Sequence, residues 1–136
     1  MAALSAARLT QSKNLGPVKR YLMANATTIH AGGLVMINSD GLAIAAAAAA
    51  GNKGVVGVAT KSVVGTGAAD YIEVQEGWFL FAGTTLAQTV VGSLVYAEDD
   101  QTVDETQAAN EPIAGMCVEY VSASAAWVAV GPQYLT

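Results

Sequence analysis

The stretch Gly32-Gly33-Leu34-Val35-Met36-Ile37-Asn38-Ser39-Asp40-Gly41 predicts a strand followed by a tight turn. Four consecutive apolar residues after a glycine pair are typical of a short buried strand. Asp-Gly is strong turn chemistry, because glycine adopts positive φ angles without steric cost. The apolar run Leu42-Ala43-Ile44 follows the turn, so residues 34–44 predict a β-hairpin.

The same pattern returns in the second half of the chain at Gly92-Ser93-Leu94-Val95, before an acidic turn and Thr102-Val103. Further segments repeat with it: Tyr21-Leu22-Met23-Ala24 with Phe79-Leu80-Phe81-Ala82, Thr27-Thr28-Ile29 with Thr84-Thr85-Leu86, and Val56-Gly57-Val58 with Ala114-Gly115-Met116. Each half ends in another apolar strand, at residues 71–74 or 126–130. We expect a single β domain over residues 21–136 with an internal repeat, about 21–76 and 77–131, and an N-terminal arm over residues 1–20.

Short strands separated by turns every 8–12 residues predict a small β-barrel or sandwich. The segment Tyr71–Gln75 alternates, which places Ile72 and Val74 on one face of a strand. Helix is expected only as one or two short turns, at the alanine run 45–50 and at its counterpart 104–110. The predicted fold class is therefore mainly β, built from two similar halves.

The composition indicates a folded protein with an apolar surface. Of the 136 residues, 53% are hydrophobic and 12% are charged. We interpret part of this excess as subunit interface, because contiguous apolar surface usually marks association; the alternative is a small, alanine-rich β domain. The uncharged segment 77–97 is too polar and too rich in glycine to span a membrane as a helix.

Charge is distributed unevenly along the chain. The arm, residues 1–20, contains four basic residues and no acidic residue: Arg8, Lys13, Lys19 and Arg20. The rest of the chain carries two lysines against all 11 acidic residues. Three interpretations of the arm stay open: a transit peptide, an arm held by a partner, and a segment packed on its own domain. We favour the arm held by a partner and take the four basic residues as its contact residues.

The residues needed for catalysis or metal binding are scarce. Cys117 lies in a strand-like run, where a buried thiol is expected, and His30 is expected in a turn or a half-buried position. One cysteine and one histidine give neither a nucleophile–base pair nor a zinc site. The acidic cluster at residues 98–105 lacks the spacing of an EF-hand, so a solvated turn is favoured over a calcium site. We expect no enzyme activity and no cofactor, and the acidic body disfavours nucleic acid as a partner.

A larger pattern resembles the capsid decoration (cement) proteins of tailed bacteriophages. It is carried by Gly32–Val35, Asp40-Gly41, Val56–Ala59, Ile72–Gly77, Gly92–Asp100 and Trp127–Val130. The resemblance implies a β-tulip or small-barrel fold. It further implies a homo-oligomer, with a trimer as the leading expectation, on the outer surface of the phage head after synthesis in the host cytoplasm. There it would bridge neighbouring subunits of the major capsid protein.

The alternative is a non-enzymatic binding module that recognises carbohydrate or another protein. Such a module would expose an aromatic platform, for which the candidates are Trp78, Phe79, Tyr96 and Tyr134. All but Tyr134 fall in strand-like runs, so a place in the core is the stronger expectation for them. Trp127, in the last predicted strand, is also expected in the core.

Overall fold

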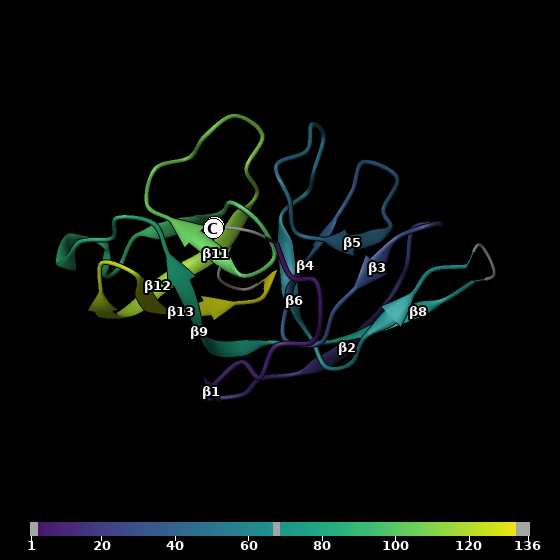
Figure 1. Ribbon diagram of the computed structural model, residues 1–136, viewed down its shortest axis with the longest axis horizontal. Helices are drawn as coiled ribbons and strands as arrows, with labels where there is room; N and C mark the ends of the chain where they lie inside the picture. The colour runs from purple at the N-terminus through teal and green to yellow at the C-terminus, as the bar shows by residue number, and fades with distance from the viewer. Residues whose placement is uncertain (1–2, 67–68, 133–136) are drawn as a thin grey trace.

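The computed structural model describes residues 3–66 and 69–132, and its fold is mainly β, as the sequence predicts. The strands before the middle of the chain are β1 (Ser12–Lys13), β2 (Val18–Leu22), β3 (Thr28–Ile29), β4 (Leu34–Ile37), β5 (Ala43–Ala45), β6 (Val55–Ala59), β7 (Val63–Val64) and β8 (Tyr71–Gln75). The strands after it are β9 (Gly77–Gly83), β10 (Leu94–Ala97), β11 (Thr102–Asp104), β12 (Ile113–Ser122) and β13 (Ala125–Val130). Apart from β1, which pairs with β9, the two sets lie on opposite sides of the molecule (Figure 1).

The second half of the chain forms a closed five-stranded barrel. Its sheet runs β9-β11-β10-β12-β13 and returns to β9 through the β9–β13 pairing. Closure removes the free edges that an open sheet would leave. We call this unit the second barrel; it lies on the left in Figure 1.

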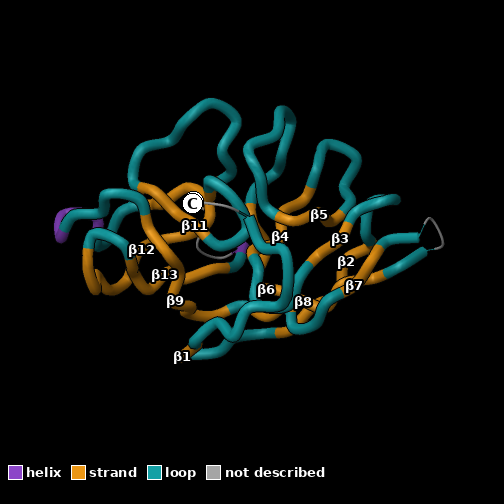
Figure 2. Tube along the Cα trace, viewed as in Figure 1, coloured by secondary structure: helices purple, strands orange, loops and turns teal. Residues whose placement is uncertain are grey.

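The first half follows the same order of strands: its sheet β2-β8-β6-β4-β5 corresponds to β9-β13-β12-β10-β11 when the second barrel is followed from β9 through β13. A parallel bridge between Met23 and Ala43 joins the two ends of this sheet. The main-chain N–H of Ala24 donates to the Ala43 carbonyl at 3.1 Å, and at the equivalent place in the second half Thr84 donates to Val103 at the same distance. We call this unit the first barrel. A small separate sheet, β3 with β7, lies at one of its ends (Figure 2).

Strand register repeats between the two barrels as well as strand order. Val35 lies opposite Gly57, and Val95 lies opposite Gly115. A register shift follows each valine at the equivalent step, after Val35 in β4 and after Val95 in β10. A β-bulge at the same place in both halves shows that the sequence repeat is also a repeat of backbone geometry.

The structure corrects the sequence alignment of the two halves at their first strand. Met23 bridges to Ala43 of β5, and Gly83 pairs with the equivalent Val103 of β11, so Met23 corresponds to Gly83 and Tyr21 corresponds to Phe81 and not to Phe79. The spacing between equivalent residues is therefore the same here as between Val35 and Val95. Phe79 and Phe81 are two residues apart on one face of their strand, so the sequence alone allows Tyr21 to be aligned with either of them.

The alternation of side chains places one apolar set inside each barrel. Val35, Ile72 and Val74 belong to the core of the first barrel, which confirms the face predicted for Tyr71–Gln75. Phe81 and Val95 lie in the core of the second barrel and are fully buried. Cys117 is also fully buried there, as expected.

Helix is less extensive and differently placed than expected. The one helix whose residues are all described is η1 (Gln88–Val90), a single 3-10 turn at the far end of the second barrel (Figure 2). The alanine run 45–50 and its counterpart 104–110 contain strand ends and turns, so the helical turns predicted there are wrong. Main-chain N–H groups of the alanine run bond to residues outside it: Ala46 donates to the Leu34 carbonyl, and Ala49 donates to the Asn110 carbonyl. These tertiary bonds override a helix propensity that six residues cannot exploit.

No helix within residues 3–66 and 69–132 is long and apolar enough to cross a membrane.

Candidate functional site

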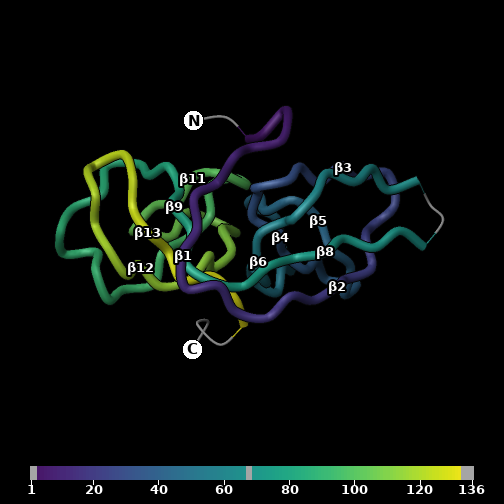
Figure 3. The backbone as a smooth tube through the Cα atoms, turned by 90° about the horizontal axis from the view of Figure 1, so that it is seen from below, coloured from purple at the N-terminus to yellow at the C-terminus, as the bar shows by residue number. Residues whose placement is uncertain are grey.

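The segment 3–17, which we call the strap, runs along the boundary between the two barrels (Figure 3). Near its start, the Arg8 N–H donates to the Ala31 carbonyl of the first half at 2.7 Å. Further on, β1 pairs antiparallel with β9 of the second barrel, with Ser12 opposite Phe79 and Lys13 opposite Trp78. The strap therefore ties the two barrels together through main-chain hydrogen bonds.

Two glycines make room for this path. A Cβ atom at Gly32 would lie 2.0 Å from the Arg8 carbonyl oxygen, and a Cβ at Gly33 would lie 2.9 Å from Leu4 Cδ1. Any side chain at Gly32 would collide with the strap backbone. The glycine pair thus serves the close approach of the strap in addition to the turn that the sequence predicts.

Arg8 is the most enclosed of the four predicted contact residues. Its guanidinium donates to Thr10 Oγ1 and to the Leu80 carbonyl, each at 3.0 Å, and lies 5.2 Å from the centroid of the Phe81 ring. Burial lowers the pKa of Arg8 from its ordinary value. Because the bond to Leu80 and the contact with Phe81 are both made with β9, Arg8 fastens the strap to the second barrel.

Lys13 is exposed but contacts two other side chains. Its Nζ lies 3.1 Å from Glu119 Oε1 and 4.1 Å from the centroid of the Trp127 ring. Both side chains of the ion pair are about half exposed, so the pair adds little to stability. The contact with the indole ring is a cation–π interaction, and it covers part of Trp127.

Lys19 and Arg20 belong to the first barrel and not to the arm, because β2 begins at Val18. Lys19 Nζ lies 5.3 Å from the Tyr21 ring centroid, and Arg20 Cζ lies 4.8 Å from that of Tyr71. The boundary predicted at residue 20 therefore falls inside a strand. The four basic residues do not form one patch; they are divided between the strap and β2.

The described part of the arm packs on its own domain, which is one of the interpretations that the sequence left open. The reason is that β11 pairs with β9 only at Ala82 and Gly83, so the beginning of β9 offers main-chain donors and acceptors on that side to an extended segment within reach. Apolar side chains nonetheless point into solvent along this side. Leu9 is 100% exposed, Leu15 58% and Val18 51%. These exposed residues carry no pattern that sequence reasoning could have separated from core residues.

The aromatic residues of the second barrel divide between its two faces. Phe79 is 4% exposed and belongs to the core, as expected. Trp78, Tyr96 and Trp127 are only half-buried, because they alternate with inward-facing residues and so lie on the outer face. The expectation of a core position is wrong for these three. Tyr134 lies outside the described residues.

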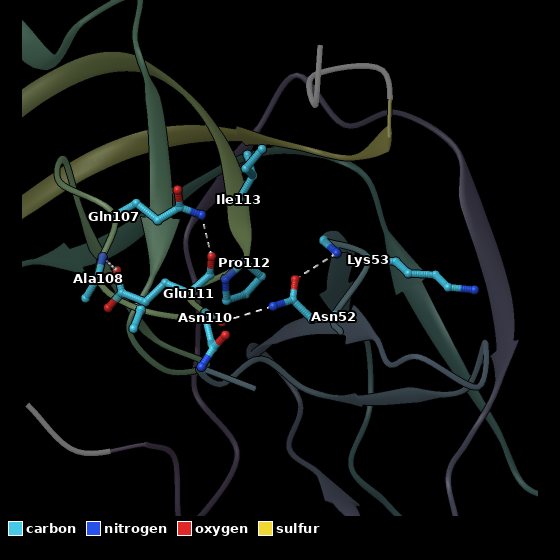
Figure 4. Close-up of a pocket in the computed structure, with 10 residues that line it drawn as sticks. Asn52, Lys53, Gln107, Ala108, Asn110, Glu111, Pro112 and Ile113 are labelled. Atoms are coloured by element: carbon cyan, nitrogen blue, oxygen red, sulfur yellow. Dashed lines mark hydrogen bonds between the residues drawn. The ribbon is translucent and has the colours of Figure 1, made fainter. Parts of the chain in front are cut away.

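A polar cavity of about 660 Å³ lies between two equivalent loops, 52–54 of the first half and 107–113 of the second (Figure 4). The Asn52 side chain donates to the carbonyls of Ala49 at 2.8 Å and Asn110 at 3.0 Å. Gln107 donates to the Glu111 carbonyl at 2.9 Å. The side chains of Asn52 and Gln107 thus bond to main-chain groups of the two loops, and the bond from Asn52 to Asn110 joins one loop to the other.

Carboxyl groups gather beside this cavity on the outer face of β11. Burial, with repulsion from Glu111 and Glu98, raises the pKa of Asp104 to about 7. Asp104 Oδ1 is buried and has no hydrogen-bond partner among the described residues. Within the described ranges, no group of three or more His, Cys, Asp or Glu side chains is arranged to hold a metal ion.

The two residues considered for nucleophilic chemistry lie in different halves of the chain, and no contact between them is formed within the described residues. His30 is half-buried in the turn between β3 and β4, whereas Cys117 lies on β12 inside the second barrel. Burial raises the pKa of the Cys117 thiol, which disfavours the reactive thiolate. No protein-family model matches the chain, and no curated protein matches its sequence.

Proposed function

We propose that this protein is a structural virion protein that binds the outside of an assembled phage head and bridges subunits of the major capsid protein. The sequence resemblance to capsid decoration proteins suggests this role. The observation that carries the proposal is an apolar face that is buried in the first barrel and half-exposed at the equivalent positions of the second. A protein of this kind acts by adding interface area, for which such a face is suited.

In the first barrel, this face packs against the second barrel. Leu34 and Met36 of β4 and Val55 and Val58 of β6 are at most 3% exposed, and all four belong to the core cluster of the second barrel. They flank inward-facing residues such as Val35, so they lie on the outside of their own barrel. The contact between the barrels within one chain is therefore made by the outer face of β4 and β6.

The equivalent face of the second barrel consists of Leu94 and Tyr96 of β10 with Ile113 and Met116 of β12. We call it the second apolar face. Its four residues are only half-buried. Packing it against the first barrel of another copy would repeat, between chains, the contact that exists within one chain. Such a head-to-tail contact closes into a ring when its rotation angle divides a full turn, as in a trimer, and otherwise gives a filament, whereas a self-complementary contact gives dimers. We propose the trimeric ring.

Ring formation also supports attachment to a capsid. A ring presents several copies of one binding surface to a shell that is itself symmetric. When two or three copies bind together, overall binding can exceed single-site affinity by about 10²–10⁴-fold. Binding only to the assembled shell then stabilises that shell by mass action.

The first experiment measures oligomeric state by sedimentation velocity. We expect the purified chain to sediment as a trimer and Met116→Glu to sediment as a monomer, because a charge would be buried in the second apolar face. Val121→Glu is the matched control, since Val121 lies on the same strand and is already 51% exposed. A monomeric parent chain, or equal behaviour of the two variants, would contradict the proposed ring.

The second experiment measures binding to heads. Empty expanded heads of the phage that encodes the chain are pelleted with the parent chain, with Met116→Glu and with Val121→Glu. We expect the parent and Val121→Glu to pellet with the heads and Met116→Glu to stay in the supernatant, because it loses multivalency. Absence of head binding by the parent chain would refute the capsid role whatever the oligomeric state.

A binding module remains the second candidate, because Trp78 and Trp127 lie half-exposed on the neighbouring strands β9 and β13. Aromatic rings on an outer face are suited to sugar rings or to apolar peptides. Tryptophan fluorescence during titration with a panel of soluble glycans tests this function. A saturable change that Trp127→Ala abolishes would favour it over the capsid role.

A further inference from the structure

The outer edge of β2 has unpaired main-chain groups. At one end of the β2–β8 ladder Glu76 N–H donates to Pro17 at 3.0 Å, and at the other Met23 N–H donates to Asp70 at 2.8 Å. Antiparallel ladders alternate, so Lys19 and Tyr21 face β8 while Val18 and Arg20 turn their N–H and C=O groups away from it. No strand within residues 3–66 and 69–132 pairs with β2 on that side at these two positions.

The equivalent edge in the second barrel is covered. β9 corresponds to β2, and because Phe81 is the counterpart of Tyr21, Leu80 is the counterpart of Arg20. The Leu80 N–H donates to the Gln11 carbonyl at 3.0 Å, and β1 pairs with β9 next to it. One copy of the repeated edge thus binds an extended segment, while the other copy binds none of the described chain.

The outer face beside this edge combines apolar and basic groups. Val18, Arg20 and Leu22 alternate along it, and Val18 is 51% and Leu22 38% exposed. Tyr71, opposite Leu22, is 46% exposed and lies under the Arg20 guanidinium. Glu73 of β8 lies opposite Arg20 but forms no ion pair with it within the described ranges, and its Oε1 accepts a hydrogen bond from Thr60 Oγ1. The Arg20 guanidinium is therefore available to a partner.

The positive charge of Arg20 determines which kind of segment can pair with this edge. If β2 of a second copy paired with it antiparallel about Arg20, the two Arg20 side chains would face each other, and like charges opposite one another destabilise a sheet. A basic segment such as the strap of another copy meets the same repulsion. An acidic side chain opposite Arg20, with apolar neighbours at the positions opposite Val18 and Leu22, fits the edge.

We propose that the outer edge of β2 binds an extended segment of a partner protein by strand addition, with an acidic residue opposite Arg20 and apolar residues opposite Val18 and Leu22. Main-chain bonds to Val18 and Arg20 supply affinity, and the alternating side chains supply specificity. The proposal goes beyond the capsid role and does not depend on it, because it concerns the chemistry of the edge and not the source of the segment.

The test uses the full chain and two synthetic peptides, acetyl-TVTETVT-amide and acetyl-TVTKTVT-amide. Binding is followed by amide chemical shifts and by hydrogen exchange of the ¹⁵N-labelled protein. We expect the glutamate peptide to shift residues 18–22 and to protect the Val18 and Arg20 amides from exchange. We expect it to bind about tenfold more tightly than the lysine peptide at low salt, because opposite charges attract across the new strand pair.

Two variants separate the contribution of the Arg20 charge to peptide binding from that of main-chain pairing. Arg20→Gln keeps the main-chain donor, so it should bind both peptides alike; Arg20→Glu should prefer the lysine peptide. A reversal of preference cannot arise from a merely structural role of Arg20. If Arg20→Glu does not fold, the loss of preference in Arg20→Gln carries the test.

Three results would overturn the proposal. They are shifts that map outside residues 18–22, no binding or equal binding of the two peptides by the parent chain, and protection of the Val18 and Arg20 amides that grows with protein concentration without peptide. The last would mean that a second copy covers the edge. None of these results depends on binding to heads, so the two proposals fail independently.

Discussion

The carboxylate of Asp100, which is 2% exposed, accepts a 2.7 Å hydrogen bond from the main-chain N–H of Leu4, near the opposite end of the chain. Burial raises the pKa of Asp100, and the bond from Leu4 opposes that rise. A buried acidic residue of the second half thus holds the beginning of the strap. The contact has no sequence signature, because nothing near Leu4 marks it as a partner of Asp100.

The Asp100–Leu4 contact predicts that Asp100→Ala loosens the strap. Removing the acceptor leaves the Leu4 N–H without a partner, so we expect the free energy of unfolding to fall by about 1–2 kcal/mol. Asp100→Asn keeps a side-chain acceptor and removes the buried charge, so it should equal or exceed the parent in stability. Urea unfolding measures the change, and faster hydrogen exchange at Leu4 in Asp100→Ala alone locates it. Equal loss in both variants would mean that the charge matters and the bond does not.

The equivalent glycines of the two barrels should respond differently to substitution. A Cβ at Gly115 would lie 2.0 Å from the Ala129 carbonyl oxygen, whereas at Gly57 the nearest atom, the Gln75 carbonyl oxygen, is 3.1 Å away. We expect Gly115→Ala to lower the free energy of unfolding by about 3 kcal/mol or more, and Gly57→Ala by about 1 kcal/mol. Thermal unfolding of the two variants gives the comparison, and the opposite order would contradict the close approach of β12 to β13.

Trp127 should matter less for stability than its size suggests. It is half-buried on the outer face under Lys13, whereas Phe81 is fully buried inside the same barrel. We expect Phe81→Ala to cost about 3–5 kcal/mol, and Trp127→Ala about 1–2 kcal/mol, because little cavity forms at an outer position. Chemical unfolding monitored by circular dichroism measures both. If Trp127→Ala lowered the free energy of unfolding as much as Phe81→Ala, Trp127 would belong to the core.

The raised pKa of Asp104 predicts that the free energy of unfolding falls as pH rises toward neutrality. Its pKa of about 7 in the folded protein lies above the ordinary value of 3.8, so the folded state binds more protons than the unfolded state between these values. Stability then decreases with rising pH through this window and levels off above about pH 7. After allowing for solvent screening, we expect a loss of about 1–2 kcal/mol between pH 4 and pH 8.

Asp104→Asn is the control for this pH effect. It removes the titrating group but keeps the shape of the side chain, so its stability should vary less over the same pH range. At pH 8 it should be more stable than the parent chain. A parent chain whose stability is flat or rises from pH 4 to pH 8, with no difference from Asp104→Asn, would show that the carboxyl cluster does not hold the proton.

The local sequence pattern was sufficient to predict most of the strands and turns. The hairpins at residues 34–45 and 94–104 follow from apolar runs around turn residues, and the burial of Ile72 and Val74 follows from alternation. It was not sufficient for the alanine run 45–50, where hydrogen bonds to Leu34 and Asn110 replace a helix. Propensity over so short a run is weaker than two tertiary bonds.

The site was harder to predict than the fold. Arg8, Lys13, Lys19 and Arg20 share a charge and a region of sequence, but the structure separates them into a strap and a strand. The start of β2 at Val18 depends on pairing with Gln75, a contact between distant residues. Likewise, nothing in Trp78 or Trp127 shows which face of its strand points inward, since both faces of β9 and β13 carry apolar residues.

The amino-acid sequence by itself determined that two β units exist, because apolar alternation and glycine-bearing turns are local properties that recur in both halves of the chain. Only the tertiary structure decided which repeated surfaces are covered. The edge of β9 lies under β1 while the edge of β2 is open, and the outer face of β4 is buried while that of β10 is half-exposed. Equivalent sequences differ in this way because burial depends on which neighbour the chain brings to each copy, and the strap and the other barrel can each cover only one.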